Sequence, residues 1–260
     1  MSYETILFEE SRGIARITLN RPEKLNSFNT QMQQELRDSL RSAERSARVI
    51  VLTGAGRGFS AGQDLADRAQ TGGQTVDLGH TVETSWNPLI RRLATMPQPI
   101  IARVNGVAAG AGANVAFACD LVVACRSSKF IQSFTQIGLI PDSGGSWVLP
   151  RLVGQARALG LALTGEPLSA EKAEDWGLIW KAVDDDALDA EVDAIASKLA
   201  SLPPLGLDAI KDIIRTTGKR TLDQELDLQR DEMRRLGFTE DYREGVAAFL
   251  EKRTPSFTGR

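Results

Sequence analysis

The sequence predicts an α/β fold in which helices cover a sheet and a helix-rich segment ends the chain. Short apolar and β-branched runs alternate with helical patterns up to Arg151, and mainly helical patterns follow it. Such alternation is typical of a sheet covered by helices. With 260 residues, the chain is long enough to bury a substantial core.

The first half of the chain contains five strand-like runs and one long helical pattern. An apolar stripe with helical spacing extends from Met32 to Ala43. A candidate capping box, formed by Thr30 and Gln33, precedes this stripe, so we expect the helix to begin near Thr30. The strand-like runs are Thr5–Phe8, Ile14–Leu19, Val49–Thr53, Pro99–Val104 and Leu121–Ala124.

After Arg151 one strand-like run, Leu178–Val183, interrupts a series of helical patterns. Pro203-Pro204 and Gly218 separate these helices, and Thr221 with Gln224 forms a second candidate capping box. The expected helices are Gln155–Leu163, Ala170–Trp176, Ala187–Leu202, Leu207–Thr216, Leu222–Leu236 and Glu240–Lys252.

The composition argues against several classes of function. The chain has 31 basic and 34 acidic residues, a formal net charge of −3, and no basic patch for nucleic acid or membrane lipid. The N-terminus has neither a signal-peptide pattern nor a long apolar run, so we expect a cytoplasmic protein. Cys119 and Cys125 are too few for a disulfide framework, and a single histidine, His80, leaves no ligand set for a metal site.

Three glycine-rich turns are the candidate functional segments. They are Gly58–Asp64, Gly110–Gly112 and Ile140–Gly145, and the third contains a lone carboxylate, Asp142. Backbone amides exposed at the ends of strands can stabilise a developing oxyanion, and two of the turns could each supply one. Together with Asp142, this pattern suggests proton-transfer chemistry.

The same turns do not fit nucleotide-binding or hydrolase motifs. The dinucleotide fingerprint fails because Phe59 and Val115 stand where the third glycine should be, and no phosphate-binding GxxxxGK[ST] loop exists. Gly58-Phe59-Ser60-Ala61-Gly62 matches a nucleophile elbow, but the sole histidine, His80, follows too closely for a Ser-Asp-His order. We therefore interpret that match as accidental.

Asp142 and Asn114 also have plain structural interpretations. Aspartate is among the best helix N-caps, so Asp142 could simply cap the helix that follows it. Asn114 could be an ordinary polar residue early in a helix. The segment Ala69–His80 is a long, weakly patterned loop, which we interpret as a candidate lid.

Four sequence blocks resemble the signature blocks of the crotonase (enoyl-CoA hydratase/isomerase) superfamily. They occur in the family's order, and the resemblance extends from Ile6 to Gly259. The blocks are Asn20–Phe28, Gly58–Leu65, Asn105–Gly112 and Gly138–Gly145.

The resemblance implies a crotonase-like spiral of ββα units with a C-terminal helical trimerisation region. Residues 1–200 would then form the acyl-CoA-binding core. Residues 201–260 would serve oligomerisation and cover the active site. The expected assembly is a homotrimer or a dimer of trimers.

The resemblance also assigns site residues. It implies that the amides of Ala61 and Ala111 form the oxyanion hole for a CoA thioester, with coenzyme A entering as part of the substrate and no further cofactor. The aromatic ring of Phe257 would approach the adenine of a CoA molecule bound to its own or to a neighbouring subunit. The residues expected to line the substrate path are Lys24, Leu25, Ala61, Gln63, Asp64, Leu65, Ala109 and Phe134.

The chain departs from the family's hydratase pattern at two positions. Asn114 and Phe134 stand where hydratases carry two glutamates, whereas Asp142 stands where several isomerases carry their acid/base. Without that pair, water addition would lose two groups, each contributing about 10²–10⁴ in rate. The resemblance therefore implies an acyl-CoA isomerase that uses Asp142, acts on an aromatic ring epoxide and also shifts double bonds.

Other activities remain open at this point. One is residual enoyl-CoA hydratase activity, and another is an acyl-CoA hydrolase or dehalogenase with Asp142 as nucleophile and His80 as base. From a different class, a non-catalytic CoA- or RNA-binding relative is possible, but the net charge of −3 does not favour RNA.

Overall fold

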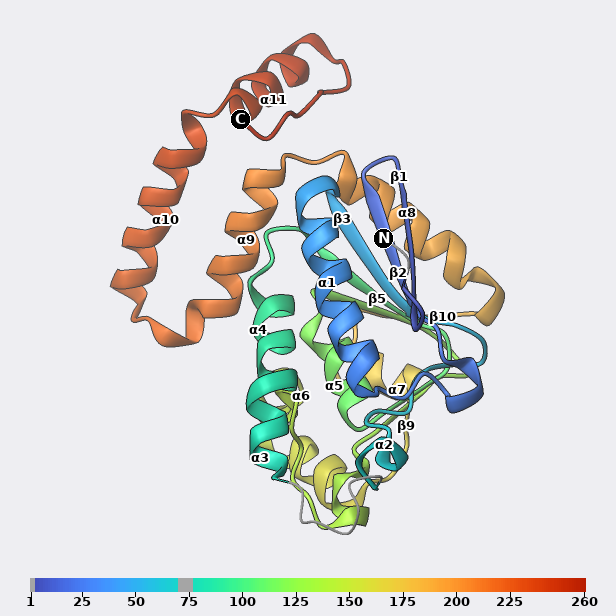
Figure 1. The fold of residues 1–260 in the computed structure, drawn as a ribbon. Helices are drawn as coiled ribbons and strands as arrows, with labels where there is room; N and C mark the ends of the chain where they lie inside the picture. The colour runs from blue at the N-terminus through green and yellow to red at the C-terminus, as the bar shows by residue number, and fades with distance from the viewer. Residues whose placement is uncertain (1–2, 70–76) are drawn as a thin grey trace.

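The structure is a computed structural model that describes residues 3–69 and 77–260. Two sheets lie within a shell of helices, and the last helices extend from one end of this core (Figure 1). Within the described residues, no helix has the length and apolarity needed to cross a membrane. The strands are β1 (Ile6–Ser11), β2 (Ile14–Leu19), β3 (Val49–Gly54), β4 (Gly58–Ser60), β5 (Ile100–Val104), β6 (Val107–Ala109), β7 (Leu121–Cys125), β8 (Lys129–Ile131), β9 (Leu168–Ser169) and β10 (Lys181–Val183).

The helices comprise α-helices and short 3-10 or π segments. The predicted α/β class is confirmed, and the helical patterns after Arg151 are confirmed in outline. The α-helices are α1 (Thr30–Ser46), α2 (Leu65–Ala69), α3 (Leu78–Thr81), α4 (Asn87–Thr95), α5 (Ala111–Ala118), α6 (Gly145–Thr164), α7 (Ala170–Asp175), α8 (Leu188–Ala200), α9 (Pro204–Thr216), α10 (Leu222–Gly237) and α11 (Glu240–Glu251). The short segments are η1 (Pro22–Lys24), η2 (Val82–Trp86), η3 (Ser133–Ile137), η4 (Asp185–Ala187) and η5 (Thr217–Lys219).

From β3 to β8, consecutive strands alternate between the two sheets. The larger sheet has the order β1-β2-β3-β5-β7-β10, and the smaller has the order β4-β6-β8-β9. The chain therefore passes from β3 to β4, from β5 to β6 and from β7 to β8 by crossing from one sheet to the other. Helices follow each of these pairs, so the path repeats a ββα unit.

The centre of the larger sheet is buried on both faces, whereas its edge strand β1 is largely exposed. Val49 and Val51 of β3 pack with Val192 of α8 in one apolar cluster, whereas Ile50 and Leu52 face the main core. Because side chains alternate along a strand, a strand buried on both sides needs a continuous apolar run. Val49–Thr53 is such a run, which explains why the sequence reveals this strand clearly.

The N-terminal cap of α1 differs from the sequence-based expectation. Asn29 is the cap, because its side chain accepts a hydrogen bond from the amide of Met32 at 2.8 Å. Thr30 is already helical, and its hydroxyl donates to Asp67 instead. The capping box predicted for Thr30 and Gln33 is therefore wrong. The second predicted box, Thr221 with Gln224 at the start of α10, is confirmed.

A partly buried ionic cluster fastens α9 to the core. Asp120 forms ion pairs with Lys211 and Arg215 of α9, each at 2.8 Å, and accepts a hydrogen bond from the Ile100 amide at 2.7 Å. Burial lowers the pKa of Lys211, although Asp120 opposes that effect. Burial also raises the pKa of the neighbouring Cys119 thiol to about 12, so this thiol stays protonated at neutral pH. The cluster therefore fixes the base of the C-terminal helices.

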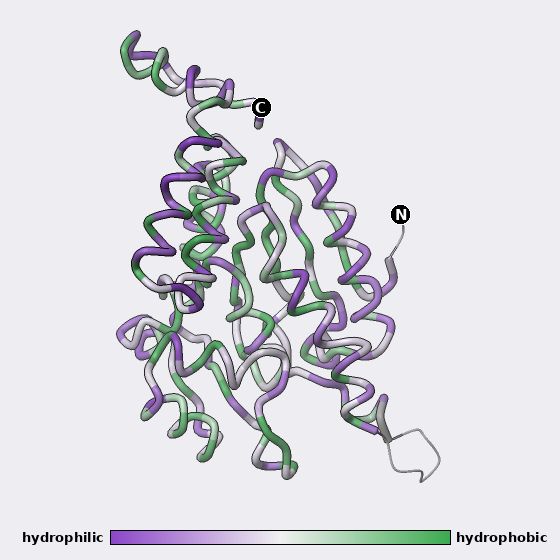
Figure 2. Tube along the Cα trace, turned by 90° about the vertical axis from the view of Figure 1, so that its left-hand side faces the viewer, coloured by the Kyte–Doolittle hydropathy of each residue, from purple (hydrophilic) through white to green (hydrophobic). Residues whose placement is uncertain are grey.

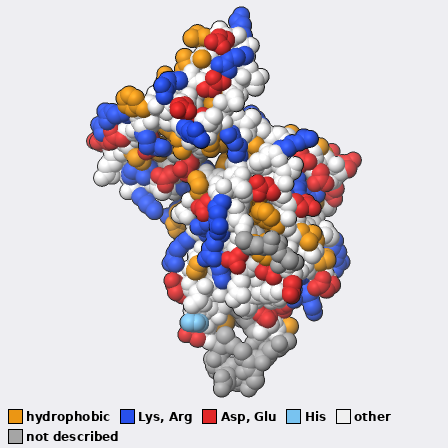
Figure 3. Space-filling model, turned by 45° about the horizontal axis from the view of Figure 1, so that its top comes forward, with side chains coloured by type: hydrophobic (Ala, Val, Ile, Leu, Met, Phe, Trp, Pro, Cys, Tyr) orange, Lys and Arg blue, Asp and Glu red, His pale blue; other side chains and the backbone are white. Residues whose placement is uncertain are grey.

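The C-terminal helices α10 and α11 extend away from the core (Figure 1). They expose apolar side chains. Apolar and polar positions alternate along them in Figure 2, and apolar side chains lie at the surface among charged ones in Figure 3. Leu222, Met233 and Phe249 are each more than 70% exposed. One domain does not cover this surface by itself.

Candidate active site

The smaller sheet brings three loop segments to one edge. Its strands β4, β6 and β8 are parallel neighbours, so their carboxyl ends lie together. The residues that follow these strands are Ala61–Asp64, Gly110-Ala111 and Gln132–Phe134. Two of the three predicted glycine-rich turns therefore meet at this edge, together with a third segment that contains Phe134. The amide of Gly110 donates to the carbonyl of Ile131 at 2.8 Å and joins the second segment to the third.

Gly62 is the point of closest approach between the first two turns. Its φ angle is +90°, and a Cβ atom placed on it would lie 2.7 Å from the Ala109 carbonyl oxygen and 3.2 Å from the Ala111 nitrogen. A side chain cannot occupy that space, and L-residues rarely adopt that φ. Only glycine lets the two turns approach this closely.

The amide of Ala111 lies at the start of α5. The first amides of a helix have no intrahelical acceptor, and the helix dipole makes this end attractive to negative charge. Gly110 precedes the helix with a φ angle of +51°, which turns the chain sharply out of β6. The Ala111 amide thus lies at a helix start where an oxyanion would be stabilised, and its role there stays a prediction.

The sequence-based assignment of the Ala61 amide to an oxyanion hole is contradicted. This amide donates to the Leu25 carbonyl at 2.9 Å, so its single hydrogen is already in use. Gln63 offers an alternative, because Phe28 pairs with this segment through the Gly62 carbonyl and the Asp64 amide. The backbone N–H of Gln63 therefore points away from Phe28, toward the side where β6 and Ala111 lie, whereas its side-chain amide donates to the Phe28 carbonyl at 3.0 Å.

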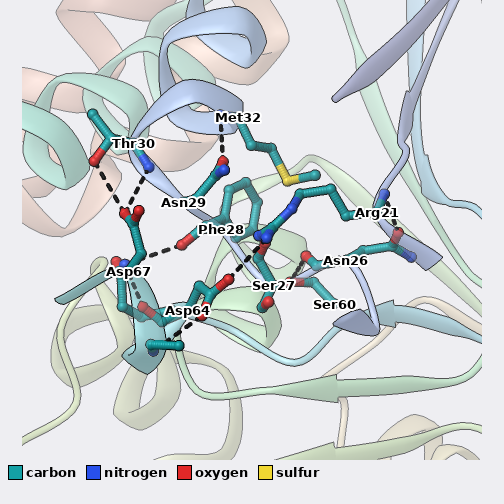
Figure 4. Close-up of polar contacts among 12 residues, drawn as sticks. Arg21, Asn26, Ser27, Phe28, Asn29, Thr30, Met32, Ser60, Asp64 and Asp67 are labelled. Carbon is teal, nitrogen blue, oxygen red and sulfur yellow. Dashed lines mark hydrogen bonds and ion pairs between the residues drawn. The ribbon is translucent and has the colours of Figure 1, made fainter. Parts of the chain in front are cut away.

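An ion pair joins the Arg21–Phe28 segment to the first turn (Figure 4). Arg21 and Asp64 are 2.9 Å apart, with side chains 16% and 11% exposed. Burial alone would raise the pKa of Asp64, but hydrogen bonds from Arg21 and from the amides of Ala66 and Asp67 outweigh it and lower the pKa. The carboxylate of Asp64 is thus engaged in holding the loop.

Asn26 reinforces the same loop. It is fully buried, and its side-chain amide donates to the carbonyls of Ala55 and Gly58 at 2.9 and 2.8 Å. Its own carbonyl accepts the hydroxyl of Ser60 at 2.8 Å, as Figure 4 shows. These contacts keep the Arg21–Phe28 segment against β4.

The residues predicted to line the substrate path fall into two adjoining groups. Lys24 and Leu25 lie on the loop, and Lys24 is exposed. Gln63 and Leu65 follow the first turn, and Leu65 is half exposed. The structure places these residues on neighbouring segments, with Asp64 turned toward Arg21 and the Ala109 carbonyl packed against Gly62. Their contact with a substrate stays a prediction.

Asp142 is not a helix cap. Helix α6 begins at Gly145, its N-cap is Gly144, and no side chain caps it. The Asp142 carboxylate instead accepts the hydroxyl of Ser143 at 3.0 Å, and its backbone carbonyl accepts the side-chain amide of Asn114 at 2.8 Å. The side chain of Asp142 is partly exposed. This removes the structural interpretation that competed with an acid/base role.

Asn114 and Phe134 lie beside Asp142 and Ala111 without contributing a carboxylate. Asn114 is fully buried on α5, one turn after Ala111, and Phe134 is 7% exposed. The ring of Phe134 lies close to Gly110, where a Cβ atom would be 3.9 Å away from it. Asn114 is thus more than an ordinary polar residue, since it contacts the Asp142 segment directly.

The nucleophile-elbow interpretation is excluded by the surroundings of Ser60. This serine is fully buried, and its hydroxyl donates to the Asn26 carbonyl and accepts the Gly62 amide. A serine held in this way cannot attack a substrate. His80 is exposed on the short helix α3 and has no contact with Ser60.

Phe257 does not join the site within one chain. Its ring packs near Gly245 of α11, and its carbonyl accepts a hydrogen bond from Arg48. In Figure 1 this end of the chain lies opposite α2, which follows the first turn. Its contact with the adenine of CoA, on its own or a neighbouring subunit, stays a prediction. The candidate lid at Ala69–His80 lies largely outside the described residues.

Two residues near the site were absent from the sequence-based candidates. Arg21 belongs to the first of the four sequence blocks that resemble the family. Its positive charge, opposite to that of Asp64, could have indicated the ion pair between the two residues. Gln132 is only 3% exposed, and its Nε2 donates to the Asn114 Oδ1 at 3.0 Å. Nothing in the local sequence marks this glutamine.

Comparison with known proteins identifies the class. Residues 9–260 match the enoyl-CoA hydratase/isomerase family. The chain is 53% identical over 260 residues to the 1,2-epoxyphenylacetyl-CoA isomerase of Escherichia coli (strain K12), with 99% of each chain covered. It is 47% identical over 260 residues to a probable enoyl-CoA hydratase of Rhodobacter capsulatus, with 100% of each covered. A solved structure, enoyl-CoA hydratase from Bacillus anthracis, gives a TM-score of 0.93 at 33% identity and covers 99% of this chain and 100% of that one.

The fold is therefore the crotonase fold, as the sequence resemblance implied. The chain belongs to the enoyl-CoA hydratase/isomerase family and is an enzyme that acts on CoA thioesters.

The close approach at Gly62 gives a direct test of the site geometry. We expect Gly62→Ala to destabilise the protein by about 2–5 kcal/mol, since it adds steric overlap to backbone strain. Turnover of a CoA thioester should fall by about 10²-fold or more, because the two turns would separate. Urea unfolding and steady-state kinetics measure the two effects.

Gly13→Ala is the matched control. Gly13 also has a positive φ angle, +74°, but a Cβ atom there would meet no atom closer than 3.6 Å. It should lose only about 1–2 kcal/mol and keep its activity. Equal behaviour of the two variants would show that the close approach at Gly62 does not hold the site.

Proposed function

We propose that this enzyme is an acyl-CoA isomerase in which Asp142 transfers the proton. The observation that carries the proposal is the distribution of carboxylates around the Ala111 amide. Asn114 and Phe134 supply none, whereas Asp142 has a partly exposed side chain and a backbone fixed by Asn114. One carboxylate suffices to move a proton along a substrate, whereas the family's hydration chemistry uses two.

The proposed mechanism begins with the thioester carbonyl. Its oxygen would accept hydrogen bonds from the Ala111 and Gln63 amides, with Gln63 replacing the engaged Ala61. Such donors lower the barrier only if they bind the enolate more strongly than the ground-state carbonyl, and their fixed orientation favours this.

Asp142 would then act as base and acid in turn. For a 3-enoyl-CoA, its carboxylate takes a proton from C2, and the electron pair delocalises over the thioester and the double bond. The same carboxyl group returns the proton to C4, so the 2-enoyl isomer forms with no net change in atoms. This chemistry calls for no metal or redox cofactor, and coenzyme A enters only as part of the substrate.

We further propose that the acyl group is an aromatic ring epoxide, as the name of the 53% identical relative from E. coli indicates for that protein. A second candidate, hydration of an enoyl-CoA, is favoured by the name of the relative from R. capsulatus. The residues at positions 114 and 134 argue against hydration, because neither can activate water.

Substitution of the proposed acid/base separates these possibilities. We expect Asp142→Asn to lower kcat for isomerisation of a 3-enoyl-CoA by about 10²–10⁴, because it removes the base but keeps the shape. KM and the melting temperature should change little. Asp38→Asn, at an exposed position of α1, serves as control and should leave all three unchanged. Near-normal turnover of Asp142→Asn would refute the proposed role.

We also propose that the enzyme assembles as a homotrimer or a dimer of trimers through residues 201–260. The exposed apolar side chains of α10 and α11, such as Leu222, Met233 and Phe249, support this. Light scattering should then give a mass of about three or six times the 28.2 kDa chain. A mass near that of one chain at micromolar concentration would contradict it.

A further inference from the structure

Asn114 is the one strongly polar side chain on an otherwise apolar helix. The sequence of α5 is AGANVAFA, and all eight of its residues are buried. Burying a side-chain amide is unfavourable unless both ends of it are hydrogen-bonded. At Asn114 both ends are satisfied, and one of the two partners belongs to the Asp142 segment.

The two hydrogen bonds fix the orientation of the Asn114 amide. Its Nδ2 donates to the Asp142 carbonyl at 2.8 Å, and its Oδ1 accepts from Gln132 Nε2 at 3.0 Å. A carbonyl can only accept, so the nitrogen of Asn114 must face Asp142. Gln132 Oε1 is buried with no partner within the described part of the chain, so the Nε2 that donates to Asn114 is the satisfied end of this side-chain amide.

Gly145 makes room for this contact. A Cβ atom at Gly145 would lie 2.3 Å from Asn114 Nδ2, so the first residue of α6 must be glycine if the amide is to reach Asp142. The Gly145 amide also donates to the Asp142 carbonyl at 2.8 Å. The backbone at Asp142 is thus held from two helices.

The same helix presents the proposed oxyanion donor. Ala111 and Asn114 are three residues apart on α5, which places them on neighbouring positions of one helix face. The distance between the Ala111 amide and the Asp142 backbone is therefore set within one turn of one helix. Misplacement of a catalytic group by about 1 Å can cost about 10²-fold in rate.

We infer that Asn114 is a positioning residue that holds Asp142 at a fixed place relative to the Ala111 amide, and that Gln132 orients the Asn114 side chain for this purpose. This inference rests on the proposed function, in which Asp142 moves the proton. It also explains why an amide suits position 114. A glutamate there would have no N–H for the Asp142 carbonyl and would add a negative charge beside the reacting carboxylate.

Single and double variants test the inference. Asn114→Leu removes both hydrogen bonds, and Asn114→Asp keeps the size and the acceptor but loses the donor. Each should lower kcat for the 3-enoyl-CoA about 10- to 100-fold, with KM changed less than about threefold. Gln132→Leu should also lower kcat, but by a smaller factor than the Asn114 variants. Ser39→Ala, which removes another fully buried hydrogen bond on α1, should lower only the melting temperature.

The double variants with Asp142→Asn distinguish positioning from stability. If Asn114 acts through Asp142, its substitution in the Asp142→Asn background should change kcat less than about twofold. Multiplicative losses in the double variant, a rise in KM alone, or wild-type kcat in both Asn114 variants would overturn the inference. Full activity of Asp142→Asn by itself would instead refute the proposed function, so the two failures are distinguishable. If Asn114→Leu does not fold, Asn114→Asp and Gln132→Leu carry the test.

Discussion

The close approach of Gly62 to Ala109 and Ala111 is the contact on which the site depends. Parallel pairing of β4 with β6 brings the two turns to one edge, but it does not determine how near their backbones come. The missing side chain at Gly62 does so, because any Cβ atom would meet the Ala109 carbonyl oxygen. The interactions of Arg21 with Asp64 and of Asn26 with Ala55 and Gly58 then hold the loop that covers this junction.

The backbone contacts around Gly62 also determine where the charged groups of the site lie. Helix α5 begins at Ala111, where its dipole favours negative charge, and Asn114 and Phe134 supply no carboxylate beside it. The carboxylate appears one segment further on, at Asp142, and the amide at position 114 contacts its backbone. Under the proposed function, an exchange of side chains at these positions would leave the oxyanion-binding part intact and change the way protons are handled. One fold can host different reactions in this way, because the reaction depends on the residues of the site.

The long elements were predictable from the sequence because each has a strong local pattern. The strand at Val49–Thr53 is a continuous apolar run, and α1 shows a stripe of apolar residues with helical spacing. The strands β4, β6 and β8 were missed as strands, since three residues are too few to show a period of two. The helix caps were harder to predict, because Asn29 and Thr30 are adjacent and both are suitable N-caps. Only the structure shows that the Asn29 side chain accepts a hydrogen bond from the Met32 amide.

The site was predictable as a set of turns but not in its hydrogen bonds. Glycine and Asp142 mark the turns locally, whereas the direction of each amide depends on distant pairing. Ala61 is unsuitable because Leu25 lies against it, and Gln63 faces the other way because Phe28 pairs beside it. Gln132 has no local indication at all, because its role arises from a contact with Asn114, eighteen residues earlier in the chain.

The most direct measurement follows the atoms of a 3-enoyl-CoA in isotopically labelled water. In H₂¹⁸O the main product should be the 2-enoyl isomer without ¹⁸O, with any hydrated product formed far more slowly. Mass spectrometry of the CoA ester reads this outcome for the purified enzyme. Rapid formation of an ¹⁸O-labelled 3-hydroxyacyl-CoA, at a rate comparable to isomerisation, would contradict the claim that this site moves protons and does not add water.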